Sequence, residues 1–371
     1  MDRVLHIVMA MNRGGLESFI MNIYRNIDRN KIQFDFIVHT DKECDYDQEI
    51  LKLGGKIYRV PSRRNGIIRN RQALNSFFNE YDEYSVVHQH VSSLSYIEPI
   101  KAAKRSGIKT RIIHSHSSKQ NGSYINKYLH YINRLFIDKI ATHYFTCSDL
   151  AAKWLYGKRR FKKEEYKIIN NGIDLNRFIY DYQIRTDYRT KFDLNNKFVV
   201  GHVGRFAHPK NHEFLIDIFK AIYDKEPNSV LLLVGNGELR GKIEEKSKNM
   251  GLRDSIIFTG VRHDVNNLLQ AMDVFVFPSH YEGLPVSLVE AQAAGLLCFT
   301  SSTITKQVNL TNLIKNIDIT YPADYWADCI LTTSRNNNRD NIPSDFSIKD
   351  FDVYQVVEEL TKFYQESLKE L

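Results

Sequence analysis

Two patterns of hydrophobic positions alternate along the chain. Short continuous apolar runs, typical of strands buried in a parallel sheet, are followed by segments in which apolar residues recur every three or four positions, as on one face of a helix. In the first half, the predicted strands are residues 4–9, 34–39, 57–60, 85–88, 111–114 and 141–146. The predicted helices are residues 15–26, 67–79, 94–104 and 125–140. This alternation predicts an α/β fold, with a parallel sheet and helices on both of its faces.

The alternation stops near the middle of the chain and then starts again. Asn171 and Gly172 form a turn signal, and the charged stretch that follows, up to Asn196, shows neither period and is predicted to lack structure. Further strands are predicted at residues 198–203, 230–234, 256–258 and 274–277. We therefore predict two domains, residues 1–171 and residues 172–350. The tail, residues 351–371, is predicted to be an amphipathic helix with an apolar side of Val356, Leu360, Phe363 and Leu368.

Composition narrows the class of protein. With 371 residues, of which 43% are hydrophobic and 26% charged, the chain is long enough for two globular cores. The net charge of +7 suits anionic ligands or an anionic membrane surface, but it is too diffuse to indicate nucleic acid. The four cysteines are scattered and form no Cys-x-x-Cys pair, which indicates reduced thiols and a cytoplasmic protein.

No segment has the pattern of a membrane span or an export signal. No apolar run approaches the roughly 20 residues that a span requires. The run at residues 4–11 is short, and Asn12 to Gly15 follow where a signal peptide needs a small-residue cleavage site. We therefore expect this run to be the first strand of the sheet.

The stretch after the strand at residues 274–277 carries two acids around a predicted helix start. Pro285 stands where a helix begins and Gly295 where it ends. Glu282 lies in the loop before this helix, and Glu290 lies inside it. Because helical side chains lean toward the N-terminus, the Glu290 carboxylate is expected to reach the region that Glu282 overlooks.

This arrangement predicts a ligand that carries both phosphates and hydroxyls. The unpaired N–H groups and the dipole at a helix N-terminus attract an anion. Two carboxylates at the same place repel an anion unless they accept hydrogen bonds from its hydroxyls. A nucleotide sugar satisfies every group. A capped helix with one solvated glutamate has the same sequence pattern, so both interpretations stay open.

The stretch resembles the Glu-x7-Glu signature of the family 4 retaining glycosyltransferases. That family has the GT-B architecture, in which two doubly wound Rossmann-like domains face each other across a cleft. The resemblance implies that Glu282 contacts the hydroxyls of the donor sugar and that Glu290 binds the nucleotide ribose. It places Gly283, Leu284 and Pro285 at the donor. It also implies that the last helix crosses back onto the first domain.

Glycine-bearing loops at other strand ends fit the same family. Gly204, Arg205 and Lys210 follow the strand at residues 198–203. The resemblance implies that the two cations hold the donor diphosphate and stabilise it as the leaving group; an ordinary loop with solvated cations is the alternative. It also implies that Gly235 presents backbone to the nucleotide and that Arg262 lies near the base.

The first domain offers a glycine turn and two pairs of histidines. Gly14 and Gly15 resemble the family's Gly-Gly-x-Glu loop, which faces the reacting phosphates. Alternate residues of a strand face the same way, so the pairs at residues 88 and 90 and at 114 and 116 suggest a metal site and a rival function, a metal-dependent hydrolase. No acid stands close by to complete such a site. The resemblance implies a histidine at the reaction centre, for which we choose His116.

We expect no cofactor and no catalytic metal. Asp45 and Asp47 have the Asp-x-Asp spacing of metal-dependent transferases, but they do not directly follow a strand, and helix capping is the favoured interpretation. Asp350 and Asp352 have the same spacing at the start of the last helix, where capping is again expected. The donor charge is therefore expected to be met by Arg205, Lys210 and the helix N-terminus.

Two basic clusters with apolar residues among them indicate a shallow membrane contact. One holds Arg59, Arg63, Arg64, Arg69 and Arg71 with Ile67 and Ile68, and the other Lys158, Arg159, Arg160, Lys162 and Lys163 with Phe161. The opening residues resemble bacterial exopolysaccharide and capsule glycosyltransferases, which implies a UDP-sugar donor and a lipid-linked saccharide acceptor. A nucleotide-sugar epimerase of the same fold and a sugar-binding protein with an inactive site remain alternatives.

Overall fold

A computed structural model describes residues 2–117, 123–334, 339 and 346–369. The chain forms two compact units, Met1–Gly172 with Asp352–Leu371, and Ile173–Phe351. We call them unit 1 and unit 2. The predicted boundaries, after residues 171 and 350, each differ from these by one residue. The last two residues of the predicted C-terminal helix lie outside the described residues.

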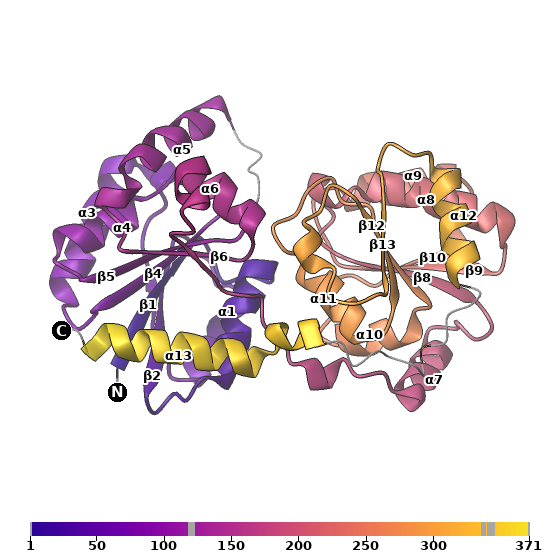
Figure 1. Ribbon diagram of the computed structural model, residues 1–371, viewed down its shortest axis with the longest axis horizontal. Helices are drawn as coiled ribbons and strands as arrows, with labels where there is room; N and C mark the ends of the chain where they lie inside the picture. The colour runs from indigo at the N-terminus through magenta and orange to yellow at the C-terminus, as the bar shows by residue number, and fades with distance from the viewer. Residues whose placement is uncertain (1, 118–122, 335–338, 340–345, 370–371) are drawn as a thin grey trace. The chain divides into compact units, whose positions relative to one another are not determined.

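Unit 1 contains a seven-stranded parallel sheet in the order β3-β2-β1-β4-β5-β6-β7 (Figure 1). The strands are β1 (Asp2–Val8), β2 (Ile32–Val38), β3 (Ile57–Arg59), β4 (Val86–Val91), β5 (Thr110–Ser115), β6 (His143–Thr146) and β7 (Lys167–Ile168). The helices are α1 (Gly15–Asn26), α2 (Asp47–Lys52), α3 (Ile67–Glu80), α4 (Glu98–Arg105), α5 (Tyr124–Phe136), α6 (Asp149–Lys162) and α13 (Val353–Lys369). The predicted parallel sheet is confirmed; α2 and α6 are additional helices.

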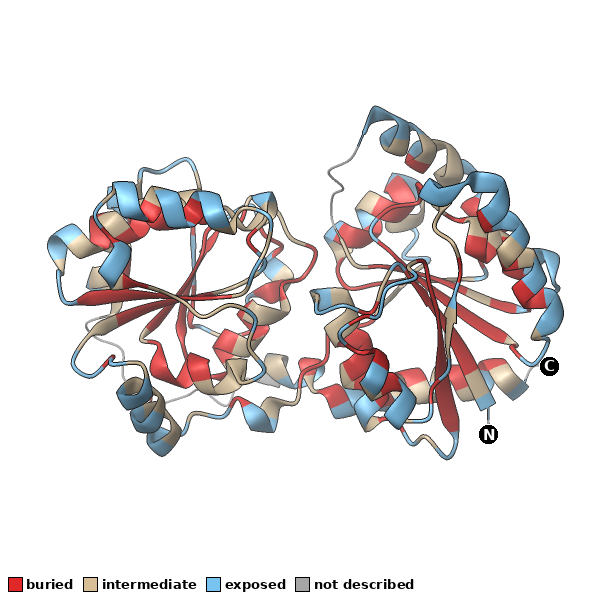
Figure 2. Ribbon diagram, turned by 180° about the vertical axis from the view of Figure 1, so that it is seen from behind, coloured by how far each residue is buried: buried red, intermediate tan, exposed pale blue. Residues whose placement is uncertain are grey.

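Each face of this sheet is covered by its own hydrophobic core. On one face Phe34, Phe36 and Val86 pack with residues of α1 and α13. On the other face Leu5, Ile37 and Ile113 pack with residues of α3, α4 and α6. Consecutive residues of the central strands alternate between the two cores, and β1, β2, β4 and β5 are buried along most of their length (Figure 2).

Unit 2 contains a six-stranded parallel sheet in the order β10-β9-β8-β11-β12-β13. The strands are β8 (Phe198–Val203), β9 (Ser229–Val234), β10 (Ile256–Phe258), β11 (Val274–Phe277), β12 (Leu297–Ser301) and β13 (Ile314–Ile317). The helices are α7 (Tyr182–Lys191), α8 (His212–Lys225), α9 (Arg240–Asn249), α10 (Val265–Ala271), α11 (Val286–Ala293) and α12 (Ala323–Ser334). The four strands predicted here are confirmed.

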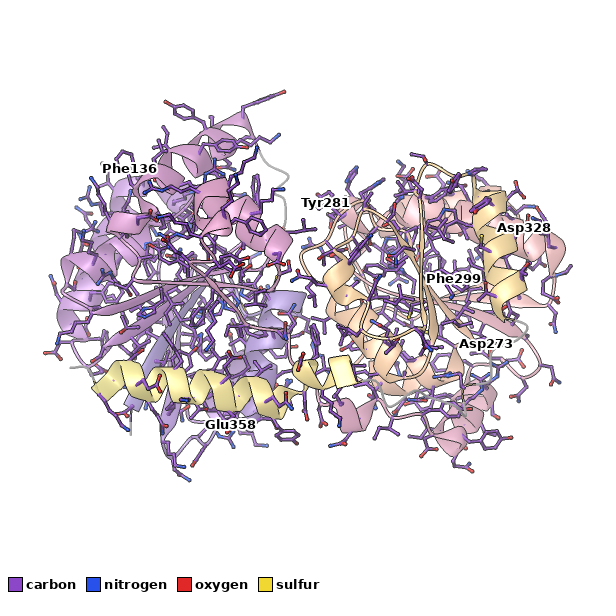
Figure 3. The ribbon with its side chains drawn as sticks, in the orientation of Figure 1. Phe136, Asp273, Tyr281, Phe299, Asp328 and Glu358 are labelled. Atoms are coloured by element: carbon purple, nitrogen blue, oxygen red, sulfur yellow. The ribbon has the colours of Figure 1, made fainter. Side chains whose placement is uncertain are left out.

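The stretch predicted to lack structure contains helix α7, so that prediction is wrong. None of the residues of α7 is buried, and the helix is held by polar contacts instead of an apolar face. Arg185 Nη2 lies 2.5 Å from Asp273 Oδ1, and Arg189 Nη1 lies 3.2 Å from Asp273 Oδ2. Asp273 stands directly before β11 (Figure 3). Hydrophobic periodicity cannot detect a helix that is fixed in this way.

The C-terminal helix α13 belongs to unit 1, where Val356, Leu360 and Tyr364 enter the core beside α1. The chain passes between the units twice, near residues 172 and 351, and each crossing is flanked by close contacts within a unit. In unit 1, a Cβ at Gly172 would lie 2.9 Å from Val353 Cα, so only glycine fits there. In unit 2, Ile173 N–H donates to Phe351 O at 2.8 Å. Among the described residues, none of the helices combines the length and the apolar character needed to cross a membrane.

Candidate active site

The topology of each sheet identifies the edge where a ligand binds. In a doubly wound sheet, ligands bind outside the carboxyl ends of the two strands between which the chain direction reverses. In unit 2 these are β8 and β11, which are neighbours in the sheet. In unit 1 they are β1 and β4. The loops after these four strands hold most of the predicted site residues.

In unit 2, the loops after β8 and β11 are hydrogen-bonded to each other. The first contains the short 3-10 helix η4 (His208–Lys210). His280 N–H donates to Pro209 O at 2.8 Å, and Asn211 Nδ2 donates to Pro278 O at 3.1 Å. Asn211 has a left-handed backbone, with φ of 54°, and this turn begins α8. The contacts fix η4 beside the loop that carries Tyr281 (Figure 3).

This arrangement brings Lys210 and Glu282 together. Lys210 Nζ lies 2.9 Å from Glu282 Oε1, and the two side chains are only 17% and 15% exposed. Lys210 Nζ also lies 4.4 Å from the centre of the Phe277 ring, a cation–π contact from the end of β11. The sequence predicts both residues as site residues, but it does not predict that they pair. A partly buried pair is screened less by water than a fully exposed pair, so its charges act more strongly on a nearby ligand.

Helix α11 holds Glu290 in a setting that opposes its charge. Pro285 is the N-cap of α11, and Gly295 follows the helix with φ of 71°, close to the predicted bounds. Burial raises the pKa of the Glu290 carboxyl to about 7, while the charge of Arg177 acts in the opposite direction. The carboxyl therefore changes its proton occupancy near neutral pH, and its proton affinity is sensitive to any ligand beside it.

Arg205 differs from Lys210 in its exposure. Its side chain is 74% exposed, and its guanidinium Nη2 lies 3.1 Å from Glu238 Oε2. Pairs of exposed charges contribute little to stability, so Arg205 can exchange this contact for one with a ligand at little cost. Glu238 lies in the loop after β9 and was not among the predicted site residues.

Gly204 and Gly235 let two loops pack backbone against backbone. Gly235 has φ of 137°, and a Cβ there would lie 2.1 Å from Gly204 O. Gly235 N–H donates to Gly260 O at 2.9 Å. These contacts give both glycines a packing role at the carboxyl edge of the sheet, in addition to the predicted approach to a nucleotide.

Arg262 is already bound within unit 2. Its Nε and Nη2 atoms donate to the two oxygens of Asp264 at 2.8 and 2.6 Å. Asp264 also accepts a hydrogen bond from Tyr188 Oη at 2.8 Å. The guanidinium beside Asp264 lowers the pKa of that carboxyl to about 2. The structure thus gives Arg262 an internal partner that the sequence did not indicate.

In unit 1, the glycine turn after β1 is held by the Asp-x-Asp triplet. Gly14 is the N-cap of α1, which begins at Gly15. Arg13 N–H donates to Asp45 Oδ2 at 3.0 Å. Asp47 begins α2, accepts from Cys44 N–H at 2.9 Å and pairs with Arg59 at 2.5 Å. Both acids thus have structural partners. In the second triplet, Asp352 Oδ1 accepts from Tyr354 N–H at 3.3 Å, the expected capping contact.

Five histidines form a ladder on the α1 and α13 face of the unit 1 sheet, which we call the histidine ladder. Its members are His6 from β1, His88 and His90 from β4, and His114 and His116 from β5 and the residue after it. The two predicted pairs do meet, and His6 joins them because β1 lies next to β4 in the sheet. The sequence signal that could have identified His6 is its position as a histidine within an otherwise apolar run.

The ladder consists of two hydrogen-bonded rows. In the first, His6 Nδ1 lies 2.9 Å from His90 Nε2, and His90 Nδ1 lies 2.9 Å from His116 Nε2. In the second, Tyr364 Oη lies 2.7 Å from His88 Nδ1, and His88 Nε2 lies 3.1 Å from His114 Nδ1. The rows stack on each other. His88 and His90 have ring centres 4.2 Å apart, and those of His114 and His116 are 4.0 Å apart.

All five ladder histidines are neutral at physiological pH. Burial lowers the pKa of His6 and of His116 to about 3. It also lowers the pKa of the other three well below the usual range. Charge repulsion by the neighbouring histidines further disfavours protonation of each of those three. The ladder is therefore a network of neutral donors and acceptors.

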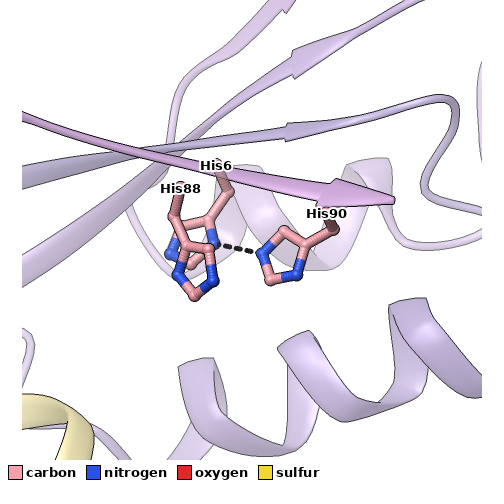
Figure 4. Close-up of side chains that lie close together, drawn as sticks. All are labelled: His6, His88 and His90. Carbon is pink, nitrogen blue, oxygen red and sulfur yellow. Dashed lines mark hydrogen bonds between the residues drawn. The ribbon is translucent and has the colours of Figure 1, made fainter. Parts of the chain in front are cut away.

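The ladder offers ligand atoms for a metal but not a convergent geometry. Two sets of three histidines each have nitrogens within 4.8 Å of one another: His90, His114 and His116, and His6, His88 and His90, of which Figure 4 shows the latter. Neutral imidazoles suit zinc. However, the lone pair of an imidazole lies in the ring plane, and His88 and His90 are stacked with planes only 21° apart. Stacked rings do not direct their nitrogens to one point, so the site fits a metal only after the rings turn.

Comparison with known proteins gives the class and then the family. Residues 184–310 match group 1 glycosyl transferases, and residues 13–177 match glycosyltransferase family 4. The crystal structure of Anabaena HepE in complex with UDP and glucose has a TM-score of 0.80 and 17% identity, covering 98% of this chain and 100% of that chain. A sucrose-phosphate synthase from Thermosynechococcus elongatus has a TM-score of 0.79 and 16% identity, covering 100% of both chains. The fold is thus the GT-B fold of glycosyltransferases, as predicted.

Curated relatives extend along most of the chain. EpsF of Bacillus subtilis (strain 168), a putative glycosyltransferase, is 35% identical over 334 residues, 88% of this chain and 86% of the relative. An α-1,3-galactosyltransferase of Escherichia coli is 28% identical over 330 residues, 85% of this chain and 82% of the relative. The chain belongs to the family 4 glycosyltransferases, and it transfers a sugar from a nucleotide sugar to an acceptor. The relatives favour this activity over the epimerase and the hydrolase.

Proposed function

We propose that the chain transfers a sugar from a UDP-sugar to a lipid-linked saccharide during assembly of a bacterial surface polysaccharide, with retention of the anomeric configuration. The partly buried ion pair of Lys210 and Glu282, at the carboxyl ends of β8 and β11, carries the proposal. It joins a cation suited to phosphate with a carboxylate suited to sugar hydroxyls. The Escherichia coli relative is named as a galactosyltransferase from UDP-Gal to an α-D-GlcNAc-diphosphoundecaprenol, and a Staphylococcus aureus relative as a glycosyltransferase of capsular polysaccharide biosynthesis.

In this mechanism, fixed protein charges take the place of a metal at the donor. When the glycosidic bond to the diphosphate breaks, negative charge develops on the leaving phosphate. Lys210 and Arg205 neutralise it, and the N–H groups at the start of α11 add an oriented dipole. Glu282 orients the donor sugar through its hydroxyls, and Glu290 binds the ribose. His116 lies at the carboxyl edge of the unit 1 sheet and donates a hydrogen bond to the reacting groups.

A single assay tests the donor, the acceptor, the stereochemistry and the metal requirement. The full chain, treated with a chelator and gel-filtered, is incubated with a panel of UDP-sugars and an undecaprenyl-diphosphate-linked sugar. We expect one donor to give an extended lipid-linked product with an α-linkage from an α-configured donor, at the same rate with and without added Mg²⁺ or Mn²⁺. A β-linkage, or activity restored only by a metal, would contradict the proposed mechanism. Conversion of the free nucleotide sugar without acceptor would identify an epimerase.

An exposed apolar stripe in unit 1 supports a membrane-bound acceptor. On α5, Tyr124, Tyr128, Tyr131 and Leu135 recur at helical spacing along one side, and each is at least 48% exposed. Ile125 and Phe136 flank the stripe; Phe136 lies at the end of the helix (Figure 3). Such an exposed apolar helix face is typical of helices that lie in a membrane interface.

Some arginines of the two basic clusters form contacts within unit 1, one of them with α5, and the other basic residues are exposed. Arg63 bridges Ser95 O and Asn126 Oδ1, which attaches its own 3-10 turn to α5. Arg160 pairs with Asp138 at 2.6 Å. Arg59, Arg63 and Arg160 are therefore engaged within unit 1. The exposed members of the two clusters, which stay candidates for anionic lipid headgroups, are Arg64, Arg69, Arg71, Lys158, Arg159, Lys162 and Lys163, beside the exposed Ile67 and Ile68.

A further inference from the structure

The first row of the histidine ladder ends at His116, the residue proposed to meet the reacting groups. His116 follows β5 at the carboxyl edge of the sheet, and its backbone N–H donates to Val91 O at 3.1 Å. Its Nε2 faces His90 Nδ1 at 2.9 Å. Nδ1 is thus the ring nitrogen of His116 that the ladder leaves to a ligand. Whether Nδ1 donates or accepts depends on which nitrogen carries the proton.

A row of neutral imidazoles has only two proton arrangements. Each ring carries one N–H, and each of the two hydrogen bonds, His6 to His90 and His90 to His116, holds one proton. If the protons point toward His6, then His6 Nε2 carries an N–H and His116 Nδ1 is a bare acceptor. If they point toward His116, then His6 Nε2 is bare and His116 Nδ1 carries an N–H. The two ends of the row are therefore coupled.

The buried end of the row decides between these arrangements. His6 is 2% exposed, and its Nε2 has no hydrogen-bond partner among the described residues. Its ring packs against Phe34, with the centres 4.1 Å apart. Orphaned N–H donors are rarer in protein interiors than under-satisfied acceptors, so the bare nitrogen belongs at this end. The protons then point toward His116.

We propose that His6 and His90 are positioning residues that hold His116 in its Nδ1–H tautomer. His6 Nδ1–H donates to His90 Nε2, His90 Nδ1–H donates to His116 Nε2, and His116 presents an uncharged N–H from Nδ1. In water, a free histidine prefers the proton on Nε2, so the ladder reverses the ordinary preference. Only one part of this inference rests on the proposed function: that the Nδ1–H of His116 donates a hydrogen bond to an oxygen of the donor.

Nuclear magnetic resonance with ¹⁵N-labelled histidine measures the tautomer directly in the full chain. The His116 signal is assigned by its loss in His116→Gln. We expect the Nδ1–H pattern in the wild type and the Nε2–H pattern in His90→Phe, which removes the partner of His116 Nε2. The matched control is His39→Phe, because His39 is equally buried in unit 1 and lies outside the ladder.

The wild-type spectrum decides the tautomer even if His90→Phe does not fold. An Nε2–H pattern for wild-type His116 overturns the proposal, as does an Nδ1–H pattern that persists in folded His90→Phe. One equivalent of zinc that copurifies with the chain and is absent from His90→Phe also overturns it, because the rings then hold a metal. Binding of added zinc only at large excess, with the Nδ1–H pattern kept in its absence, supports it.

Activity separates this inference from the proposed function. If His116 donates to the reacting groups, then kcat of His90→Phe is expected to fall at least tenfold, since a catalytic histidine in the wrong tautomer loses most of its contribution. His39→Phe is expected to retain kcat within about twofold. A tautomer change in His90→Phe with unchanged kcat supports the positioning role of His90 and removes His116 from the proposed reaction.

Discussion

At the scale of single residues, burial separates the two cations proposed to meet the donor diphosphate. Lys210 is mostly enclosed and already faces Glu282, whereas Arg205 is largely exposed. A charge fixed in a low-dielectric setting stabilises developing charge more than one that must leave water, because it needs little reorganisation. Lys210 is therefore expected to contribute more to the rate than Arg205.

Substitution of each cation tests this order. Lys210→Ala is expected to lower kcat by about 10²–10³-fold, the usual cost of losing one contact to transition-state charge. Arg205→Ala is expected to lower kcat by a smaller factor. Steady-state kinetics of folded variants measure both, with Lys220→Ala as control, because Lys220 pairs with Asp224 on the surface of α8. Near-normal kcat in Lys210→Ala would remove this lysine from the site.

Glu290 links stability to pH in a direction that can be measured. Its folded pKa of about 7 exceeds the ordinary value of 4.5, so the folded state favours the protonated carboxyl. Its stabilising contribution is complete below pH 4.5 and is lost as pH rises through 7. Glutamine imitates the protonated carboxyl at every pH. Glu290→Gln is therefore expected to match the wild type in melting temperature at pH 5 and to exceed it at pH 8.

The stability gain of Glu290→Gln can be estimated, and substitutions of Glu290 and Glu282 are expected to affect different steps of the reaction. The gain at pH 8 is expected to be about 1–3 kcal/mol, since each pKa unit corresponds to about 1.4 kcal/mol. Glu290→Ala is expected to weaken binding of UDP, whereas Glu282→Gln lowers kcat with little effect on that binding. Calorimetry with UDP measures both. A larger loss of UDP affinity in the Glu282 variant would reverse the roles given to the two acids.

At the scale of elements, the second row of the ladder attaches α13 to the sheet. Tyr364 Oη reaches His88 Nδ1 in the core, and Tyr364 is fully buried. Tyr364→Phe leaves His88 Nδ1 without this partner, which is expected to cost about 1–3 kcal/mol. The melting temperature is expected to fall, whereas Tyr354→Phe, on the exposed side of α13, leaves it unchanged. Equal stability of the two variants would mean that apolar packing alone holds α13.

Most elements with an apolar core face were predicted from the sequence, although α6, β12 and β13 were missed despite their buried apolar residues. The predicted central strands are mostly buried and apolar, and α11 lies between a proline and a left-handed glycine, so local signals suffice there. Helix α7 depends on Arg185 and Arg189 reaching Asp273, far along the chain. The buried Arg339 likewise binds the carbonyls of residues 269, 270, 272 and 294. No local pattern encodes such contacts.

The candidate site divides in the same way. Motif resemblance indicated Glu282, Glu290 and Lys210 as candidate site residues, because carboxylates and a cation near strand ends suit a nucleotide sugar. It did not find the pairing of Lys210 with Glu282, which depends on the hydrogen bonds between two loops. The alternation of histidines along strands indicated only two of the three strands of the histidine ladder, since the place of β1 beside β4 is a property of the whole sheet.

At the scale of the whole molecule, net charge and the apolar stripe on α5 together predict reversible membrane binding. The charge of +7 draws the chain to an anionic surface, and the stripe adds apolar area once it arrives. Fully burying one such side chain contributes about 1.5–3 kcal/mol. Removing two of them is expected to weaken binding more than tenfold, since 1.4 kcal/mol corresponds to a factor of ten.

Sedimentation with lipid vesicles measures this binding. The wild type is expected to bind phosphatidylglycerol vesicles, to release as salt rises from about 0.05 to 0.5 M because charges are screened, and to bind phosphatidylcholine vesicles weakly. The double variant Tyr128→Ser with Leu135→Ser is expected to lose binding at low salt while its melting temperature and its activity on a water-soluble acceptor stay unchanged. Tyr182→Ser with Tyr354→Ser, two exposed tyrosines on α7 and α13, is the matched control and is expected to bind normally. Equal loss in both double variants would place the membrane contact elsewhere than on α5.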